Sequence, residues 1–252
     1  MKHLIFSDAH AHPDFNNNRA DWLGQLIYDV RPDVVVDLGD TADMPSLCSY
    51  DKNKRGFVGR SYLKDIEAHN EFQDRLWFRF KKLKRRMPRR VRLIGNHEQR
   101  IERVLDLSPE LAGTVDYRDL ELERYYQDIV YYNGSTPGTI NIDGVVYGHY
   151  FTSGVMGRPI SGEHQAYSLL AKKFVSCTQG HTHVYDHCIR MDQEGRVMNG
   201  LVTGCFMDYN APWAGETNKM WWKGCFIKSN VYKGSYDLEN VSMLALKEAY
   251  DQ

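Results

Sequence analysis

The stretch Val91-Arg92-Leu93-Ile94-Gly95-Asn96-His97-Glu98 decides the fold, because it reads as a strand that ends in a set of polar side chains. Its first four residues show the apolar alternation of a strand, and a glycine and three coordinating or acid/base residues follow. Residues 99–105 then begin a helical pattern. Because α/β sheets bind ligands at the carboxyl ends of their strands, a site is predicted here. By itself, Asn96-His97 is also typical of a surface turn.

Four other apolar runs end in the same way. Each is followed by aspartate or histidine, and three of the four have a glycine beside the polar residue. These ends are Asp8 and His10 after residues 2–7, Gly39-Asp40 after 34–38, Gly148-His149 after 145–147, and Gly180-His181-Thr182-His183 after 174–179. Five such ends strengthen the prediction of one site built from strand ends.

Taken in order, the patterns Asp-x-His, Gly-Asp, Gly-Asn-His-Glu, Gly-His and Gly-His-x-His resemble the motif set of the calcineurin-like metallophosphoesterases. The resemblance runs from Asp8 to His183, and it extends to small phage and bacterial members of unassigned role. It implies an α/β fold of the four-layer α-β-β-α sandwich type, with two mixed sheets. It also implies hydrolysis of phosphoesters by a metal-activated water at a dinuclear centre.

The resemblance implies the following ligands. Asp8, His10 and His183 would hold one metal, Asn96, His149 and His181 the other, and Asp40 would bridge the two. Carboxylates and imidazoles suit manganese first, with iron, zinc, nickel or magnesium as alternatives. The motif positions contain no cysteine, which argues against a closed structural zinc site. His164 is an alternative to His149, which is preferred because it follows a glycine at a strand end.

The same resemblance places His97 on the leaving-group side, as a proton donor and not as a ligand. Asp43 matches the second aspartate of a Gly-Asp-x-x-Asp pattern and would orient that histidine, although a surface turn is a competing interpretation. His12 is expected at the rim of the site. His3 and Asp37 lie inside strands, and no motif gives them a role.

The substrate is less closely defined. Protein Ser/Thr phosphatases carry Arg-Gly after the second aspartate, and here Met44-Pro45 follows Asp43. The aromatic residues, which include Tyr209, Trp213, Trp221 and Trp222, could stack on a base, although tryptophans there are also typical of a core or an interface. The cations expected to contact substrate are Lys52, Lys54 and Arg55 in the loop over the site, and Arg100 on the helix after His97.

This mixture favours a phosphodiesterase or nuclease acting on nucleotides or nucleic acid. The alternatives are a phosphomonoesterase, acting on phosphoproteins or small molecules, and a non-catalytic metal-binding scaffold. The strongly basic run at 81–90 is expected at the opposite edge of the sheet, as a solvated helix end or a remote docking patch, because it precedes the strand whose far end holds Asn96.

Composition sets outer bounds. With 252 residues, 42% of them hydrophobic, the chain is expected to form a single domain over residues 1–252. A net charge of −1 gives no overall attraction to nucleic acid or to an anionic membrane. The five scattered cysteines are expected as buried reduced thiols. No apolar run suits a membrane span or a cleaved signal, so a cytoplasmic protein without a membrane partner is expected.

Periodicity predicts the remaining elements. Helices are expected around residues 23–30, 63–83, 119–126 and 163–173. Residues 139–147 read as a hairpin through Asp143-Gly144 that begins a second, antiparallel-rich half. Further short strands are expected beyond His183, with turns at Glu194-Gly195 and Lys233-Gly234.

Overall fold

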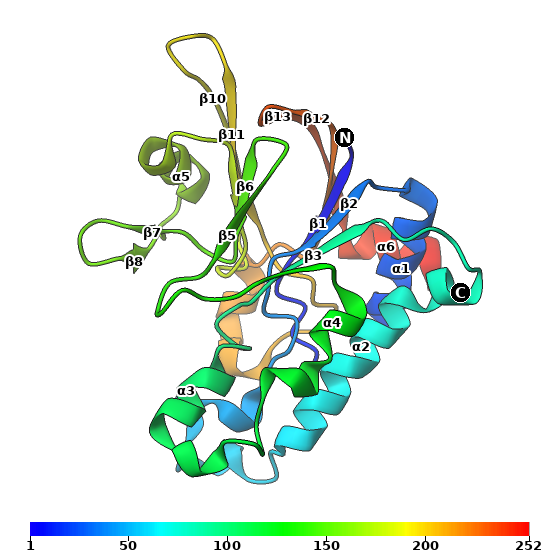
Figure 1. Ribbon diagram of the computed structural model, residues 1–252, viewed down its shortest axis with the longest axis vertical. Coiled ribbons are helices and arrows are strands. Elements are labelled where there is room, and N and C mark those ends of the chain that lie inside the picture. The colour runs from blue at the N-terminus through cyan, green and yellow to red at the C-terminus, as the bar shows by residue number, and fades with distance from the viewer. Residues whose placement is uncertain (252) are drawn as a thin grey trace.

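The computed structural model describes residues 1–251 and contains two large sheets (Figure 1). One has six strands in the order β13-β12-β1-β2-β3-β4, and the other has five in the order β10-β11-β9-β6-β5. The six-stranded sheet consists of β1 (His3–Phe6), β2 (Val34–Asp37), β3 (Arg89–Leu93), β4 (Asp128–Val130), β12 (Gly224–Tyr232) and β13 (Ser235–Ser242). The five-stranded sheet consists of β5 (Thr139–Ile142), β6 (Val145–Gly148), β9 (Cys177–Gln179), β10 (Tyr185–Met191) and β11 (Val197–Thr203).

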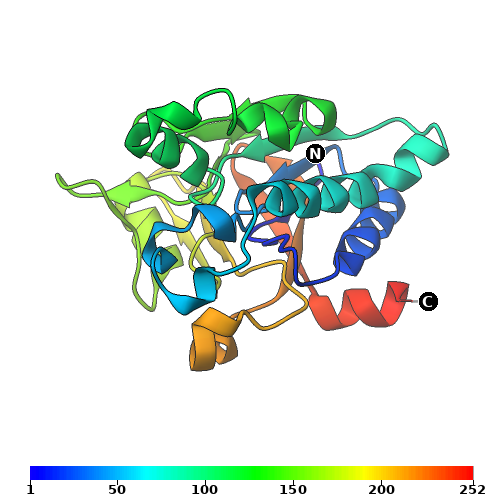
Figure 2. The same cartoon turned by 90° about the horizontal axis from the view of Figure 1, so that it is seen from below.

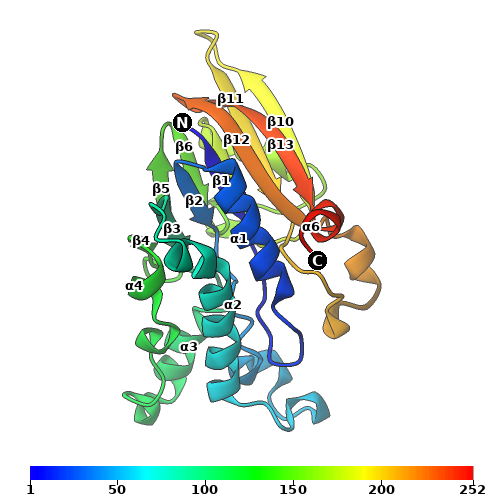
Figure 3. The same cartoon turned by 90° about the vertical axis from the view of Figure 1, so that its right-hand side faces the viewer.

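Three helices cover the outer face of the six-stranded sheet. They are α1 (Asn18–Val30), α2 (Tyr62–Lys82) and α6 (Met243–Tyr250), and α1 lies between the other two (Figure 3). Their apolar faces join one buried cluster with Leu4, Phe6 and Val35 of the sheet. The predicted helices at 23–30 and 63–83 are confirmed, because apolar residues repeat there at helical spacing against a sheet that needs covering.

The two sheets pack against each other through a second apolar cluster. Ile5, Val36 and Val91 from the six-stranded sheet meet Tyr147 and Leu201 from the five-stranded sheet in it. On the far side of the five-stranded sheet, α5 (Gln165–Lys173) packs on β9 and β11 through a third cluster. The chain is therefore α/β, with mixed sheets that each have a helix on the outer face.

Shorter elements carry the connections. After β2 the chain forms three 3-10 turns, η1 (Pro45–Leu47), η2 (Ser49–Asp51) and η3 (Arg55–Phe57). After β3 come α3 (Arg100–Leu107), η4 (Pro109–Leu111), η5 (Tyr117–Leu120) and α4 (Leu122–Tyr125). The loop after β6 holds a small hairpin of β7 (Thr152–Ser153) and β8 (Arg158–Pro159), and η6 (Pro212–Met220) precedes β12.

Several details differ from expectation. The single helix predicted at 119–126 is divided, because Glu121 adopts a left-handed conformation with φ of 48° between η5 and α4. The strands beyond His183 are not short, since β12 has nine residues and β13 eight. These two strands also leave the second half of the chain and extend the first sheet, where β12 pairs antiparallel with β1. All five cysteines are free, and three of them are buried.

The basic run at 81–90 covers the end of α2 and the start of β3. It lies at the amino end of this strand, opposite the end that leads to Asn96, as expected. Several of its cations have local partners: Arg85 lies over the Tyr28 ring, Arg90 lies over Trp77, and Arg89 pairs with Asp128. Within residues 1–251, none of the helices combines the length and apolar character needed to cross a membrane.

Candidate metal centre

Parallel pairing brings the first three polar strand ends together. β1, β2 and β3 are neighbouring parallel strands, so their carboxyl ends lie at the same end of the sheet. The loops after them begin there (Figure 2, seen from that end). The first two loops also bond directly, since Asp8 N donates to Gly39 O over 2.9 Å and His10 N donates to Asp40 O over 3.0 Å. β6 and β9 deliver His149, His181 and His183 from the other sheet, where they are parallel neighbours.

Three overlapping groups of side chains in this region could hold a metal ion. In each group, one ligand atom from every member lies within 4.8 Å of the others. The groups are Asp8, His10 and His183; His10, Asp40 and His97; and Asp40, His149 and His181. Because His10 and Asp40 each belong to two groups, the three form one continuous centre.

The first group lies at the carboxyl ends of β1 and β9. His183 Nε2 lies 3.3 Å from Asp8 Oδ1 and 3.2 Å from His10 Nε2. The other carboxylate oxygen of Asp8 is occupied, because Ser7 Oγ and, over 2.9 Å, His181 N donate to it. Asp8 Oδ1 is buried and has no hydrogen-bond partner within residues 1–251.

The second end of the centre is built around Asp40. Its Oδ2 lies 3.3 Å from His149 Nε2, and its Oδ1 accepts the His97 N–H over 2.8 Å. Asn96 Oδ1 lies 3.0 Å from the same His149 nitrogen, which places the asparagine at this group. His149 Nδ1 is 3.0 Å from the carbonyl of Leu38, so this nitrogen donates and Nε2 is left facing Asp40 and Asn96.

These residues fit a divalent cation. A buried carboxylate oxygen without a partner is unusual in a folded protein and calls for an explanation. Asp8 Oδ1 is such an atom, and the facing Nε2 atoms of His10 and His183 leave at least one lone pair beside it. Oxygen and imidazole nitrogen form the ligand set that suits manganese, iron or zinc.

The backbone is unusual at the same positions. Asp8, His10, Asp40, His181 and His183 all have positive φ, between 44° and 70°. Non-glycine residues adopt this conformation uncommonly, and each instance costs on the order of 1–3 kcal/mol. All five residues lie in the loops just after β1, β2 and β9, and surrounding contacts must hold this conformation in place.

The charges in the centre perturb its pKa values. Burial alone would raise the pKa of Asp8, but His183 and neighbouring histidines lower it to about 2. Burial lowers the pKa of His149, yet the Asp40 carboxylate outweighs this effect and raises the pKa to about 9. Burial and the nearby His149 lower the pKa of His181 to about 4. A cation bound here would therefore displace a proton from His149, whereas His181 is already neutral and would lose none.

His97 lies beside the centre, within reach of Asp43 and Arg100. Its Nδ1 is 2.7 Å from the Asp43 carbonyl and 3.2 Å from Asp43 Oδ1, so this nitrogen donates. Asp43 Oδ1 is closer still to His10, at 2.7 Å from Nδ1. Arg100 holds the same turn, because its Nη1 donates to the carbonyls of Asp43 and Met44, and its Nη2 lies 3.2 Å from His97 Nε2.

A buried charge network supports the Asp40 and Asn96 loops from behind. Arg92 is fully buried and pairs with Asp37 on one side and with Glu98 Oε1 on the other, over 2.5 Å. Glu98 also accepts the backbone N–H groups of Asp40, Gly95 and Ala42, at 3.0, 2.9 and 2.8 Å. Asp37 and Arg92 belong to none of the sequence motifs. The one local signal is the position of Arg92 inside an otherwise apolar strand, because a buried arginine needs acidic partners nearby.

Arg19 supports the Asp8 loop in a comparable way, and no sequence pattern pointed to it. It is fully buried at the start of α1 and donates to the carbonyls of Ala9 at 2.8 Å and Phe206 at 3.1 Å. Tyr209 donates to the carbonyl of His10 over 2.6 Å. The aromatic residue predicted near substrate therefore also fixes the backbone of a candidate ligand.

Two glycines of the motifs are required by close packing. A Cβ atom on Gly95 would overlap the backbone N and the Oδ1 of Asp40. A Cβ atom on Gly180 would overlap Ser7 Oγ and Asp8 Oδ2. At these strand ends the missing side chain lets two loops approach within contact distance, which explains why glycine stands beside the polar residues.

The structure separates the other predicted site residues. His149 lies in the centre, whereas His164 is exposed before α5. Lys52, Lys54 and Arg55 are exposed on the η2–η3 loop, and they make no hydrogen bond or ion pair with the centre among the described residues. Their role in binding substrate stays a prediction. Trp221 meets His183 edge-on at 4.3 Å between ring centroids, whereas Trp222 packs on Phe226 in the sheet.

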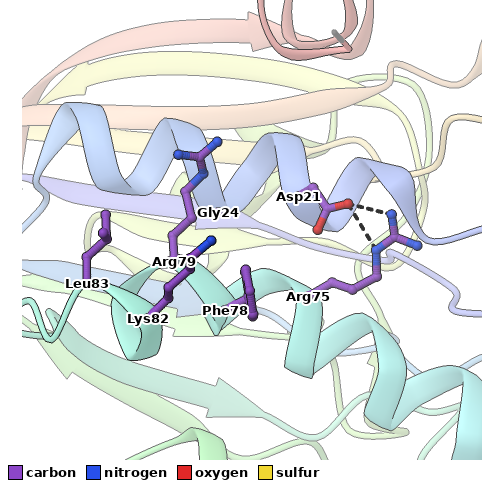
Figure 4. A pocket seen from close by; sticks show the side chains of 7 residues that line it. All are labelled: Asp21, Gly24, Arg75, Phe78, Arg79, Lys82 and Leu83. Carbon is purple, nitrogen blue, oxygen red and sulfur yellow. Dashed lines mark hydrogen bonds and ion pairs between the residues drawn. The ribbon is translucent and has the colours of Figure 1, made fainter.

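A pocket of about 350 Å³ lies away from the centre, between α1 and α2 (Figure 4). Its cations are Arg75, Arg79 and Lys82, and Phe78 stands among them. Arg75 is neutralised by an ion pair with Asp21, drawn as dashed lines in the figure. The pocket shares no residue with the three metal-ligand groups.

Comparisons with known proteins add little. No protein-family model matches the chain, and no curated protein matches it. Among solved structures, the chain is similar to Yfce, a phosphoesterase from E. coli, with 13% identity and a TM-score of 0.38 over 96% of this chain and 100% of that one. It is also similar to the Pseudomonas putida nuclease MPE, with 10% identity and a TM-score of 0.38 over 94% of this chain and 87% of that one.

Proposed function

We propose that the chain is a dinuclear-metal-dependent phosphoesterase of the calcineurin-like type. The observation that carries the proposal is the convergence of seven motif residues from five strand ends on one continuous centre. We further propose that the packing of helices and sheets is the four-layer α-β-β-α sandwich of that family, formed by a single domain.

In this proposal Asp8, His10 and His183 hold one metal. The other would be held by Asn96, His149 and His181. Asp40 would bridge the two, because it shares one group with His10 of the first set and another with His149 and His181 of the second. Manganese is the first candidate, with iron, zinc, nickel or magnesium as alternatives. When bound, two such ions would neutralise phosphoryl oxygens and lower the pKa of a water molecule that attacks phosphorus.

The residues of the chain position the rest of the reaction. His97 is fixed through Nδ1 by Asp43, which leaves Nε2 to face the leaving group and protonate it. Burial lowers the pKa of His97, but the charge of Asp40 outweighs this and the pKa is raised, so the imidazole can carry the proton it must donate. The positive charge of Arg100, whose Nη2 lies 3.2 Å from the same nitrogen, opposes protonation of His97. In a substrate complex this charge would be met by the phosphate or the departing oxygen.

The proposed substrate class is a phosphodiester in a nucleotide or nucleic acid. Support comes from the aromatic side chains near the centre, above all Trp221 beside His183 and Trp213 beside Trp221. Trp213 is 68% exposed, so its ring is available to stack on a base. Asp43 is followed by Met44-Pro45, without the Arg-Gly typical of protein phosphatases.

The test is manganese-dependent hydrolysis of bis-p-nitrophenyl phosphate compared with p-nitrophenyl phosphate. Preference for the diester is expected, whereas preference for the monoester would assign the chain to the phosphomonoesterases. Asp40→Asn is expected to lose manganese occupancy and both activities, because the proposed bridge is this carboxylate, which lies in one group with His10 and in another with His149. His97→Ala should keep its manganese and lose roughly 10² to 10⁴-fold in kcat.

The same variants test the alternatives. Normal turnover by His97→Ala would remove the proposed leaving-group role of His97. Protein that binds no manganese and hydrolyses neither ester would leave the fold with only a scaffold function.

A further inference from the structure

A second pocket, of about 420 Å³, opens beside the metal centre. Its lining includes His12, Phe15, Lys64, Asp65 and Trp213. His12 connects it to the centre, because His12 Nε2 lies 3.8 Å from Asp43 Oδ2. The volume falls in the range typical of small-molecule sites, and the pocket is distinct from the one between α1 and α2.

Two aromatic groups line this pocket. Phe15 is stacked flat on Tyr209, with ring centroids 3.8 Å apart and an angle of 7° between the planes. Trp213 contributes an exposed ring and lies 5.5 Å from Trp221, which in turn contacts His183. Phe15 is half-buried and Trp213 is exposed. Rigid aromatic side chains in a pocket beside a candidate phosphoesterase centre suit a planar ring, because every base has a face that can stack.

Polar groups in the pocket add a basis for recognition. Asp65 lines the pocket and is 1% exposed, yet its Oδ1 has no hydrogen-bond partner among the described residues. Its Oδ2 accepts the Ser46 N–H over 2.9 Å, which fixes the carboxyl group. Burial raises the pKa of Asp65 to about 6, so the group is in an environment that needs a partner.

Two cations also line the pocket, but only one is available. Arg60 is engaged, because its Nη1 lies 2.9 Å from Asp51 Oδ2 and 2.9 Å from the carbonyl of Pro45. Lys64 is exposed and makes no ion pair among residues 1–251, so it can attract an anionic substrate. The pocket therefore combines aromatic side chains, a buried hydrogen-bonding group without a partner and one unpaired positive charge. The exposed carboxylate of Asp14 also lines it, with its Oδ2 3.8 Å from His12 Nδ1.

We propose that this pocket is a subsite for the nucleobase of a nucleotide phosphodiester. The base stacks against Trp213 and Phe15, its N–H edge donates to Asp65 Oδ1, and Lys64 lies beside the sugar-phosphate. The inference rests on the proposed function, since it assumes that the neighbouring centre acts on the phosphate of the same molecule.

The test compares three esters that share one leaving group: thymidine 5′-(p-nitrophenyl) phosphate, phenyl p-nitrophenyl phosphate and methyl p-nitrophenyl phosphate. The manganese-loaded protein should favour the thymidine ester over the methyl ester in kcat/KM by roughly five- to a hundred-fold, as expected for one stacked base. Trp213→Ala should remove most of this ratio, and Trp213→Phe should retain it. Phe78→Ala, an exposed aromatic in the other pocket, should leave the ratio unchanged.

Asp65→Asn tests the polar part of the subsite. It replaces an acceptor with a donor at the unpartnered position, so the thymidine ester should lose its advantage over the phenyl ester, which presents no base edge. Equal kcat/KM for the thymidine and phenyl esters in the unmodified protein would overturn base recognition. A thymidine-to-methyl ratio near one, or a ratio that Trp213→Ala does not lower, would overturn the subsite altogether.

Calorimetry distinguishes failure of the subsite proposal from failure of the proposed phosphoesterase activity. If none of the three esters is hydrolysed, thymidine 5′-monophosphate should still bind more tightly than methyl phosphate, and Trp213→Ala should abolish the difference. Equal binding of the two phosphates would overturn the subsite independently of activity.

Discussion

Replacing Glu98 with alanine should destabilise the protein and weaken metal binding together. Glu98 contacts no other side chain of the metal centre within hydrogen-bond distance, yet its carboxylate accepts the N–H groups of Asp40, Gly95 and Ala42 and pairs with Arg92. It therefore fixes the turn before the bridging carboxylate and the turn before Asn96. The variant removes both supports while leaving every candidate ligand in place.

The magnitude follows from burial. Glu98 and Arg92 are both fully buried, and removing Glu98 leaves three backbone N–H groups without their acceptor and Arg92 with Asp37 as its remaining acid. The expected cost is about 3–5 kcal/mol. Glu98→Gln keeps the volume but gives up charge-assisted bonds and turns an amide donor toward backbone donors, for an expected loss of about 2–3 kcal/mol. Glu110 is exposed, so Glu110→Ala should change stability by less than about 0.5 kcal/mol.

The assay is urea unfolding of the metal-free protein, because bound metal would stabilise the folded state by linkage. Manganese titration of the same samples by calorimetry then gives the affinity. Glu98→Ala and Glu98→Gln should both bind manganese more weakly than the unmodified protein. A Glu98→Ala protein whose free energy of unfolding lies within about 1 kcal/mol of the unmodified protein, and whose manganese affinity is unchanged, would contradict this role of Glu98.

Three further predictions concern positions outside the ligand set. Burial lowers the pKa of His69 to about 3 from 6.5, so below about pH 6.5 the unfolded state binds a proton that the folded state cannot. Between pH 6.5 and 4.5 the unmodified protein should therefore lose about 2 kcal/mol more than His69→Leu in urea unfolding, and parallel pH profiles would contradict this. Arg19→Met should cost about 3 kcal/mol or more in the same assay, because it leaves the buried carbonyl of Ala9 without a donor, and a loss below about 1 kcal/mol would speak against that role. Gly95→Ala should fold and yet bind manganese at least ten-fold more weakly in calorimetry, since the new methyl group displaces Asp40. Unchanged affinity would show that the loop can move without displacing this carboxylate.

The candidate ligands could be found in the sequence because their signal is local. A strand's apolar alternation and the glycine and polar residues that end it lie within about ten residues, and the sheet edge then gathers the ends of parallel strands. Asp8, Asp40 and Asn96 converge for this reason, and so do His149 and His181 on the second sheet. The choice of His149 over His164 followed from the same rule, and the structure places only His149 in the centre.

What supports the centre could not be found in this way. Arg92 and Glu98 are only six residues apart, yet the buried charge network that they form also needs Asp37 from the neighbouring strand. Arg19 donates to a carbonyl 187 residues away in the chain. Such contacts are fixed by strand order and by which face of a helix meets the sheet, and neither leaves a periodic trace in the sequence.

The sequence by itself therefore determined the alternation of strands and helices and the polar residues at five strand ends, because these depend on side-chain periodicity and turn chemistry over short distances. Only the tertiary structure decided that β12 and β13 complete the first sheet, that buried charges hold the ligand loops, and that Phe15 and Trp213 line one pocket. The physical reason is that these features arise from burial and pairing between distant segments, which the folded chain settles as a whole.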